Sequence, residues 1–437
     1  MVLLSPSFNC IGRKIIHLIM TLRFIHTADI HLGKTYRSSD IEVTRYEDFF
    51  GMFSGIVEKA VSEHVDFMLI AGDLFHTAQI LPRTFARTIE TLQPLKDAGI
   101  PCIAVEGNHD WIHRHDSISW MEALSQMGYI NLLRPSRTDD GAYCFEKFDK
   151  DLGAGGCISI KGINIYGVGY IGSQAGSHVA RIVDAIRTKN NILLFHVGIW
   201  SYSPVEIGNM RAEEALPLSE MFDYVALGHG HKPYTVETPE GRTYAYNPGS
   251  AECVNFGEER FRKGYYIVEV DEGNGYRHEF YETSPRPMLV MNINLDGAKC
   301  ADEALERLEQ RIKDNVAVLT DTRQPLLEVK LTGRVGFHPF ELGRDRLRNT
   351  ISNICNPLHV EIKNHLSLVT RESDCEREMK NLAEIEEDVL RGLISSQSEY
   401  KGREDELVKY SFAIRDHVMK GDCDGDELLD LLGELGI

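Results

Sequence analysis

The chain has 437 residues, too many for one ordinary hydrophobic core, so two or three domains are expected. Hydrophobic residues make up 43% of the sequence and charged residues 26%, proportions that are typical of soluble globular proteins. No segment approaches the roughly 20 consecutive apolar residues that a membrane-spanning helix needs, which argues against a membrane protein.

The net charge is −19, an unfavourable balance for a protein that handles nucleic acid. The excess is uneven, because residues 371–437 contain 19 acidic and 9 basic residues, a difference of −10. The preceding 370 residues carry only the remaining −9. Charge therefore does not point to a nucleic-acid substrate, although the imbalance outside the tail is mild.

Nine cysteines form no Cys-x-x-Cys pair and are expected to be reduced thiols of a cytoplasmic protein. The first 20 residues lack the long apolar run and the small-residue cleavage site of a signal peptide. We expect residues 1–20 to be a disordered N-terminal extension.

Strand-like and helix-like patterns alternate in the first part of the chain. Short apolar runs predict strands at 22–28, 67–71 and 102–106. Amphipathic patterns predict helices near 44–63 and 82–97. This order is typical of βαβ units and a mostly parallel sheet. Past residue 140 the predicted strands follow more closely, at 143–146, 157–160, 163–168, 192–195, 224–227, 242–246 and 265–270. A second sheet packed on the first is the simplest arrangement.

Ser284-Pro285-Arg286-Pro287 marks a break, since each proline restricts the residue before it. We therefore expect a catalytic domain at 21–283 and a small α+β domain at 284–370. The latter shows strand patterns near 288–294, 325–331 and 358–362 and helical patterns near 301–313 and 339–353.

The acidic tail, residues 371–437, is predicted to be helical. It opens with the capping box Ser373-x-x-Glu376, after which apolar residues recur at three- and four-residue intervals. Further amphipathic runs lie near 404–419 and 426–435. The simplest arrangement is a pair of helices packed on each other or on the preceding domain.

Five polar clusters follow predicted strands at their carboxyl ends, the edge at which open α/β sheets bind ligands. They are Asp29-Ile-His31, Gly72-Asp73, Gly107-Asn108-His109-Asp110, His196 and Gly228-His229-Gly-His231. The two-residue step in Asp29-x-His31 and His229-x-His231 places both side chains of each pair on one side of an extended chain. Asp, Asn and His without a thiolate favour Mn²⁺, Fe²⁺ or Zn²⁺.

Two divalent ions about 3.5–4 Å apart would activate water for attack on phosphorus and stabilise the developing charge. Each cluster alone has an ordinary structural explanation. A polar pair commonly ends a strand, and a single histidine such as His196 is more often a core residue. Gly-Asn-His-Asp and Gly-His-Gly-His contribute nothing to a core, however, and all five clusters in this order favour a two-metal phosphoesterase.

These motifs, in this order, resemble the calcineurin-like metallophosphoesterase superfamily, whose fold is a four-layer αββα sandwich. A closer resemblance is to the SbcD-type DNA-repair exonuclease family. It rests on Gly72-Asp-Leu-Phe-His76, on Asn247-Pro-Gly-Ser250 with Phe256-Gly-Glu-Glu259, and on Lys263-Gly-Tyr265. The resemblance covers residues 22–283. It implies a DNA-binding capping domain at 284–370, a homodimer, and a tail that docks on an SbcC-type ATPase.

The resemblance also implies roles for individual residues. Asp29, His31, Asp73 and His231 would hold one metal ion, and Asp73, Asn108, His196 and His229 the other, so that Asp73 bridges. His109 would protonate or stabilise the leaving oxygen, a role that suits an imidazole near neutral pH. His76 would orient the DNA strand for exonuclease cutting, the alternative being a surface histidine at a helix start. Asp110 would orient His109.

Gly167–Gly172 fits the pattern G-x-G-x-x-G, but a dinucleotide site needs a helix that opens within the glycine turn. Because Ser173–Gly176 come first, we expect a loop between strands here.

The hypothesis is an α/β enzyme, a Mn²⁺-dependent exonuclease with single-strand endonuclease activity that hydrolyses phosphodiesters at DNA ends in repair and recombination. One alternative is a small-molecule or protein phosphoesterase on the same scaffold, which would hardly need residues 288–437. The other is a non-catalytic subunit, which would not need a complete ligand set.

Overall fold

The structure, a computed structural model, describes residues 22–34, 39–113, 116–203, 207–271, 275–316, 323–369, 382–395, 400 and 402–420. The chain forms two compact units, Met1–Arg286 and Pro287–Ile437. The predicted extension at 1–20 and the predicted helix near 426–435 lie outside the described residues. The division into a catalytic domain, a capping domain and a docking tail stays a prediction.

The first sheet is built on three parallel strands, β1 (Leu22–Thr27), β2 (Phe67–Ile70) and β3 (Cys102–Ala104). β2 and β3 are wholly apolar, and β1 is buried along its length except at the half-buried Arg23, as strands covered on both faces require. The full strand order is β16-β15-β1-β2-β3-β4, completed by β4 (Asn131–Leu132), β15 (Gly264–Asp271) and β16 (Gly275–Glu282). Only β15 and β16 run antiparallel to their neighbours.

The second sheet has the order β13-β14-β12-β9-β8-β7. Its central strands β8 (Ile163–Val168), β9 (Asn191–Phe195), β12 (Tyr224–Leu227) and β14 (Thr243–Asn247) are parallel. Its edges are the antiparallel strands β7 (Cys157–Ile160) and β13 (Tyr234–Glu237). The polar clusters singled out in the sequence follow five of these parallel strands, β1, β2 and β3 in the first sheet and β9 and β12 in the second.

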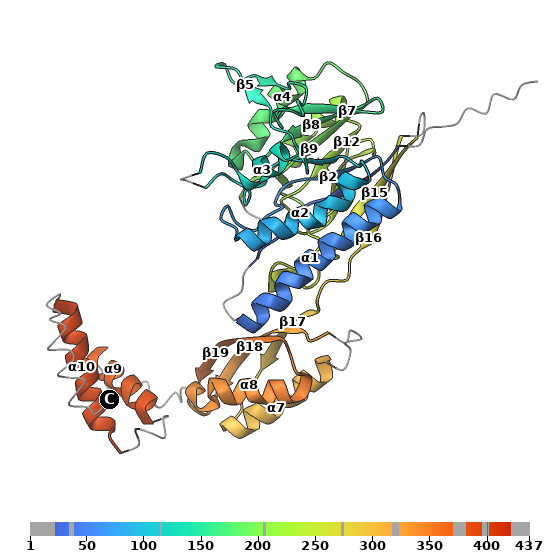
Figure 1. Ribbon diagram of the computed structural model, residues 1–437. Coiled ribbons are helices and arrows are strands. Elements are labelled where there is room, and N and C mark those ends of the chain that lie inside the picture. The colour runs from blue at the N-terminus through green and yellow to red at the C-terminus, as the bar shows by residue number, and fades with distance from the viewer. Residues whose placement is uncertain are drawn as a thin grey trace, which may run out of the picture. The chain divides into compact units, whose positions relative to one another are not determined.

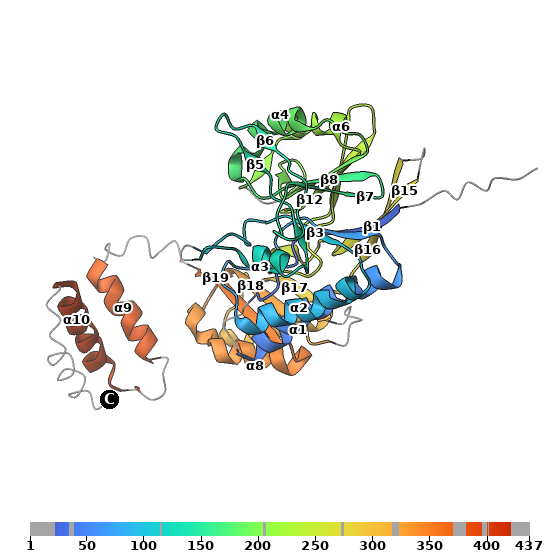
Figure 2. The ribbon, with the colours of Figure 1, turned by 45° about the horizontal axis from the view of Figure 1, so that its top comes forward.

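Four layers result, and Figure 2 shows them in order. Helices α1 (Ser39–Ser62), α2 (Pro82–Asp97) and α3 (Trp120–Gln126) cover the first sheet, and α4 (Ala175–Ala185), α5 (Ala212–Ala215) and α6 (Leu218–Met221) cover the second. A third core lies between the two sheets and includes Phe24, Phe67 and Leu194. The predicted αββα sandwich is therefore confirmed.

Two predictions from local sequence differ from the structure. Residues 172–174 form a 3₁₀ turn and α4 begins at Ala175, so the expectation of a loop after Gly167–Gly172 was wrong. Edge strand β16 was not predicted, because most of its side chains are exposed and give no apolar run. The remaining short elements are β5 (Ser136–Arg137), β6 (Tyr143–Cys144), β10 (Gly198–Ile199), β11 (Asn209–Met210) and η2 (Phe256–Glu258).

The second unit opens with a βαβαβ arrangement (Figure 1). Its strands β17 (Met288–Asn294), β18 (Leu326–Val335) and β19 (His359–Leu368) are all parallel, with β18 in the centre. Helices α7 (Ala301–Val316) and α8 (Arg344–Cys355) bury their apolar faces in one core with these strands, and η3 (Pro339–Leu342) precedes α8. Helices α9 (Leu382–Ser395) and α10 (Glu404–Lys420) pack on each other.

Among the described residues, no helix combines the length and the apolar character needed to cross a membrane. The six cysteines within the described residues are all free thiols, and two of them, Cys102 and Cys253, are buried.

Candidate metal centre

The five polar clusters begin where parallel strands of both sheets end. Asp29 and His31 follow β1, Asp73 follows β2, and Asn108 and His109 follow β3. His196 comes directly after β9, and His229 and His231 follow β12. Because the two sheets stack face to face, these carboxyl ends meet at one edge of the sandwich.

The backbone at four of these positions is left-handed. The φ angles are 51° at Asp29, 54° at His31, 53° at Asp73 and 75° at His229. Such angles are uncommon outside glycine, and residues that adopt them gather at functional sites because the surrounding structure has to enforce them. Here the turn redirects each side chain from the end of its strand toward a common centre.

Two glycines let the loops approach one another at that centre. A Cβ on Gly107 would lie well under 3.0 Å from the Asp73 carboxylate, and a Cβ on Gly228 would collide with the backbone oxygen of Ala71. Glycine is therefore required at both positions for steric reasons, independently of φ.

One group of acceptors gathers around His31. Its Nε2 lies 3.0 Å from Nε2 of His231 and 3.8 Å from Oδ2 of Asp73. Asp29, His31 and His231 each offer a ligand atom within 4.8 Å of the others. The Oδ2 atom of Asp29 is buried and has no hydrogen-bond partner in the described structure, although its Oδ1 accepts from the backbone of His229.

A second group gathers around Asn108. Its Oδ1 lies 3.2 Å from Nε2 of His196 and 3.0 Å from Nδ1 of His229. Nε2 of His196 is also 3.6 Å from Oδ2 of Asp73. That single carboxylate oxygen therefore faces both groups.

Hydrogen bonds on the far side of the rings fix which nitrogens face the centre as lone pairs. Nδ1 of His196 donates to the Ala71 carbonyl at 2.6 Å, and Nε2 of His229 donates to the Ile207 carbonyl at 2.6 Å. In neutral imidazoles the other nitrogen of each ring is then an acceptor. Lone pairs and carboxylate oxygens consequently point at one another, an arrangement that needs a cation between them.

Burial disfavours the charged form of each of these residues. It raises the pKa of Asp29 to about 6 and raises that of Asp73 well above its usual value, the latter with help from Asp110 and Asp29. Burial also lowers the pKa of His31 and His196 far below the usual imidazole value. A buried divalent cation would reverse the penalty on the carboxylates and bind the neutral imidazoles, so these residues fit a metal centre.

His231 is held from behind by a buried ion pair that sequence reasoning missed. Oε1 of Glu258 accepts from Nδ1 of His231 at 2.8 Å, and its Oε2 accepts from Nζ of Lys263 at 2.6 Å. Lys263 also donates to the Ser250 hydroxyl at 2.6 Å. Burial alone would raise the pKa of Glu258, but the bonds from His231 and Lys263 outweigh it and bring the pKa to about 2. Glu258 is thus a permanent anion that orients His231.

His109 and His76 lie together beside the first group. Their rings stack with centroids 5.2 Å apart, and His31 meets each of them edge-on. Nδ1 of His109 donates to the backbone oxygen of His76 at 2.6 Å. The two predicted catalytic histidines are therefore adjacent, and both border the predicted ligand His31.

Asp110 does not orient the ring of His109, contrary to expectation. Its carboxylate accepts from the backbone N–H groups of Leu74, Phe75 and Gly107, at 3.2, 2.9 and 2.9 Å. It ties the loop after β2 to the loop after β3, so it supports the geometry of both loops. The carbonyl of His76 fills the expected role beside His109.

Comparison with known proteins agrees with this geometry. The family model of the calcineurin-like phosphoesterases matches residues 22–233. This part of the chain is a calcineurin-like phosphoesterase domain. The earlier resemblance is confirmed at this level, and the matched stretch includes all seven predicted metal ligands and the two histidines predicted to be catalytic. A phosphoesterase domain with these acceptor groups implies divalent metal ions.

Relatives of the phosphoesterase domain occur across archaea. The protein named DNA double-strand break repair protein Mre11 from Saccharolobus solfataricus is 28% identical over 318 residues, which cover 71% of this chain and 75% of that protein. The protein of the same name from Archaeoglobus fulgidus is 27% identical, with 93% of each chain covered. That from Sulfolobus acidocaldarius is 25% identical and covers 72% of this chain and 76% of its own.

Proposed function

We propose that this protein is a Mn²⁺-dependent DNA exonuclease, with endonuclease activity on single strands, that acts at DNA ends in repair and recombination. The observation that carries the proposal is the position of Asp73, whose Oδ2 lies between the acceptor group of His31 and that of His196. A bridging carboxylate is what a two-metal phosphodiesterase requires. The choice of DNA is supported by the names of the relatives.

Asp29, His31, Asp73 and His231 would hold one ion, and Asp73, Asn108, His196 and His229 the other. When bound, two such ions supply an activated water and neutralise charge on the phosphate. The mixture of nitrogen and oxygen donors without thiolate supports Mn²⁺.

His109 would give a proton to the departing 3′ oxygen. The hydrogen bond from its Nδ1 to the His76 carbonyl persists in both protonation states, which leaves Nε2 as the atom that carries the proton. Burial lowers the pKa of His109, and that hydrogen bond opposes the shift. An anionic phosphate in the site would oppose it further.

His76 would orient the DNA strand. Its ring lies on that of His109 and its Nε2 is 3.3 Å from Nζ of Lys34, so an imidazole and an ammonium group stand together at the border of the centre. Both can contact a phosphate that adjoins the reacting one.

The rest of the chain would serve DNA and protein partners. Residues 284–370 would be a DNA-binding capping domain. The acidic tail that contains α9 and α10 would dock on an SbcC-type ATPase, and two copies of the chain would form a homodimer. We place the protein in the cytoplasm, which the free described cysteines support.

A nuclease assay on linear duplex DNA labelled at one end tests the proposal. We expect Mn²⁺-dependent release of mononucleotides, much faster than hydrolysis of a cyclic nucleotide or a chromogenic phosphodiester on a per-enzyme basis. Asp73→Asn should abolish the activity. Faster turnover of the small substrates than of DNA would instead identify a small-molecule phosphoesterase.

A further inference from the structure

A small cleft lies next to the metal centre and plays no part in the function described so far. Its volume is about 200 Å³, which suits one planar ring better than a drug-sized ligand. Its lining includes the aromatic residues Trp111, Tyr143 and Tyr170, the arginines Arg134 and Arg137, and Glu106, whose carboxylate is paired with Arg134.

Tyr170 joins the cleft to the metal centre. Its ring centroid is 5.3 Å from that of His229 and 6.0 Å from that of His196, both predicted metal ligands. On its other side it meets the ring of Trp111 at 5.8 Å. Gly208 makes room for this arrangement, since a Cβ there would lie well under 3.0 Å from the Tyr170 ring. A ligand in the cleft is thus separated from the metal ligands by one aromatic ring.

Trp111 is unusual for its position. It immediately follows Asp110 in the loop after β3, yet 54% of it is exposed. Large aromatic side chains normally bury most of their area, so this one contributes little to a core. Tyr170 is only partly buried as well. Two aromatic faces therefore remain accessible beside the reacting centre.

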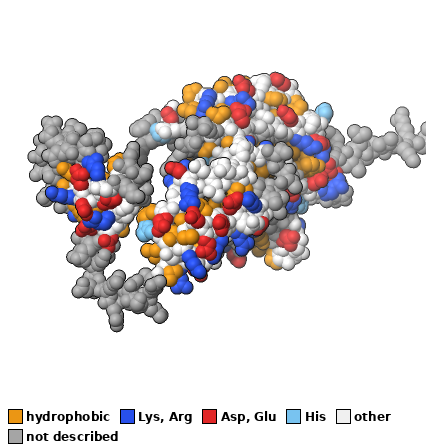
Figure 3. Space-filling model, turned by 90° about the horizontal axis from the view of Figure 1, so that it is seen from below, with side chains coloured by type: hydrophobic (Ala, Val, Ile, Leu, Met, Phe, Trp, Pro, Cys, Tyr) orange, Lys and Arg blue, Asp and Glu red, His pale blue; other side chains and the backbone are white. Residues whose placement is uncertain are grey.

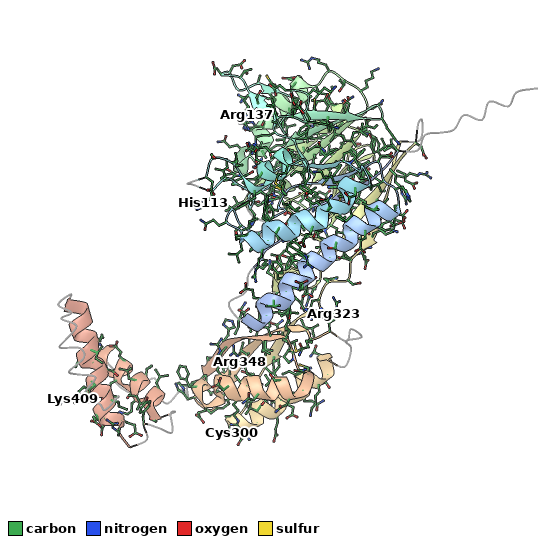
Figure 4. All side chains as sticks on the ribbon, in the orientation of Figure 1. His113, Arg137, Cys300, Arg323, Arg348 and Lys409 are labelled. Atoms are coloured by element: carbon green, nitrogen blue, oxygen red, sulfur yellow. The ribbon has the colours of Figure 1, made fainter. Side chains whose placement is uncertain are left out.

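The two arginines of the cleft differ in their partners. Arg134 is paired with Glu106 at 2.7 Å and with Glu122 at 3.2 Å. Arg137, on β5 (Figure 4), lies over the ring of Tyr143 at 4.9 Å and donates to its hydroxyl at 3.0 Å. Both of these contacts of Arg137 are with a neutral side chain and leave its charge unpaired by them. Its guanidinium is thus a cation available to an anionic group of a ligand.

We propose that this cleft binds the nucleotide that flanks the scissile phosphodiester in a single-stranded DNA end. The base stacks on Trp111 and Tyr170, and its phosphate pairs with Arg137. This inference rests on the proposed nuclease function. A single strand is required because only an unpaired base offers a free face for stacking, and every base has one, so the site is indifferent to sequence. The cleft would select unwound ends and fix the register of cutting.

A series of short oligothymidylates, each lacking the base at one different position, tests the stacking directly. Affinity is measured by fluorescence anisotropy in EDTA, with a fluorescein label at one end of the oligonucleotide and the abasic positions placed toward the other, so that no metal or cleavage is involved. At one position, loss of the base should weaken binding to the full chain by roughly 5- to 100-fold, the range of base–aromatic stacking. In Trp111→Ala this positional penalty should fall sharply, to what stacking on Tyr170 alone supplies, whereas Trp111→Phe should retain more of it.

Arg137→Ala should weaken binding of every oligonucleotide equally, because it removes a phosphate contact and not a stacking surface. Its matched control is Arg187→Ala. This exposed arginine lies just before β9, at the edge of the second sheet opposite the carboxyl ends of the strands. That variant should bind like the wild type. Melting curves of all variants establish that they are folded.

The result separates the two proposals. If the wild-type chain cleaves DNA with Mn²⁺ but tolerates abasic sites equally at all positions, the cleft is not a base site and the nuclease function stands. A positional penalty that is as large in Trp111→Ala as in the wild type has the same meaning. If the chain neither cleaves nor binds DNA, both proposals are wrong, and an aromatic phosphate ester becomes the ligand to test.

Discussion

At the centre, hydrogen-bond acceptors of different residues face one another. Each of these histidine rings is held in this orientation by a hydrogen bond from its other nitrogen. Lone pairs of His196 and His229 meet the Asn108 oxygen because the opposite nitrogen of each ring is committed to a backbone carbonyl. The same logic applies to His231, whose Nδ1 is committed to Glu258. The carbonyls and the Glu258 carboxylate therefore determine that the ring nitrogens at the centre are acceptors, which can bind a metal ion.

For His109, replacement by asparagine tests a role in chemistry apart from binding. We expect kcat for Mn²⁺-dependent DNA cleavage to fall by roughly 10²–10⁴, the usual contribution of a general acid, with little change in Mn²⁺ affinity. Single-turnover rates and calorimetric Mn²⁺ titration measure the two quantities. His113→Gln, a change in the same loop that leaves the stacked His76–His109 pair intact, is the control. Full activity in the His109 variant would refute the assignment.

For Glu258, replacement by glutamine tests whether the anion behind His231 strengthens metal binding. Without the negative charge of Glu258, the His231 ring is a less basic metal ligand and its orientation is less firmly fixed. Mn²⁺ affinity should therefore fall by roughly 10- to 100-fold. Calorimetry on the metal-free chain measures this without any turnover. Glu259→Gln is the matched control, since its neighbour Arg260 and not His231 contacts Glu259. Equal losses in both variants would mean a general structural effect.

At the scale of elements, the loops after β2 and β3 have to interlock. A methyl group at Gly107 would overlap Asp73, so Gly107→Ala should destabilise the fold by about 1–3 kcal/mol and weaken Mn²⁺ binding. Gly55→Ala provides the contrast, because this exposed glycine lies within α1 with nothing near its added Cβ. It should raise stability by about 0.5–1 kcal/mol. Thermal melting compares the two, and a stable Gly107 variant would contradict the steric argument.

Sequence patterns located most of these elements because their strands carry apolar residues at most positions, both in the almost wholly buried β8 and β12 and in the partly exposed β7 and β17. β7, β8, β12 and β17 have the predicted bounds. The failures also have physical causes. Exposed β16 depends on pairing with β15, and α4 begins among small residues whose apolar partners are distant.

The functional site, too, could be predicted only in part from the sequence. Its ligand types were recognisable, since strand ends carry them in order. Contacts made by folding were not: Trp111 and Tyr170 are far apart in sequence, and the ring of His109 reaches a carbonyl in another loop. Asp110 was therefore predicted to orient His109, its neighbour in the chain, whereas its carboxylate accepts hydrogen bonds from the backbone of Leu74 and Phe75.

For the whole molecule, the net charge of −19 opposes DNA binding, and cations bound at the centre reduce this opposition. On the face drawn in Figure 3, acidic and basic side chains are interspersed and no large patch of one sign stands out. Attraction of a phosphate chain is thus expected to depend on bound metal more than on the surface. DNA affinity should consequently rise when Ca²⁺ replaces EDTA in a binding assay without turnover, and an unchanged affinity would contradict this view.

Metal should also govern the stability of the phosphoesterase domain. Saturation at a hundred times Kd contributes about 2.7 kcal/mol, so Mn²⁺ should raise the melting temperature of the wild-type chain by several degrees. Asp29→Asn should lose this response. Without metal, however, the variant should melt above the wild type, since it removes a buried carboxylate oxygen that has no partner. Calorimetry with EDTA and with Mn²⁺ gives all four values, and Asp139→Asn, at an exposed site, should match the wild type in both. If the Asp29 variant melted lower in EDTA, the loss of the buried Oδ2 would not be stabilising and the argument from its missing partner would be wrong.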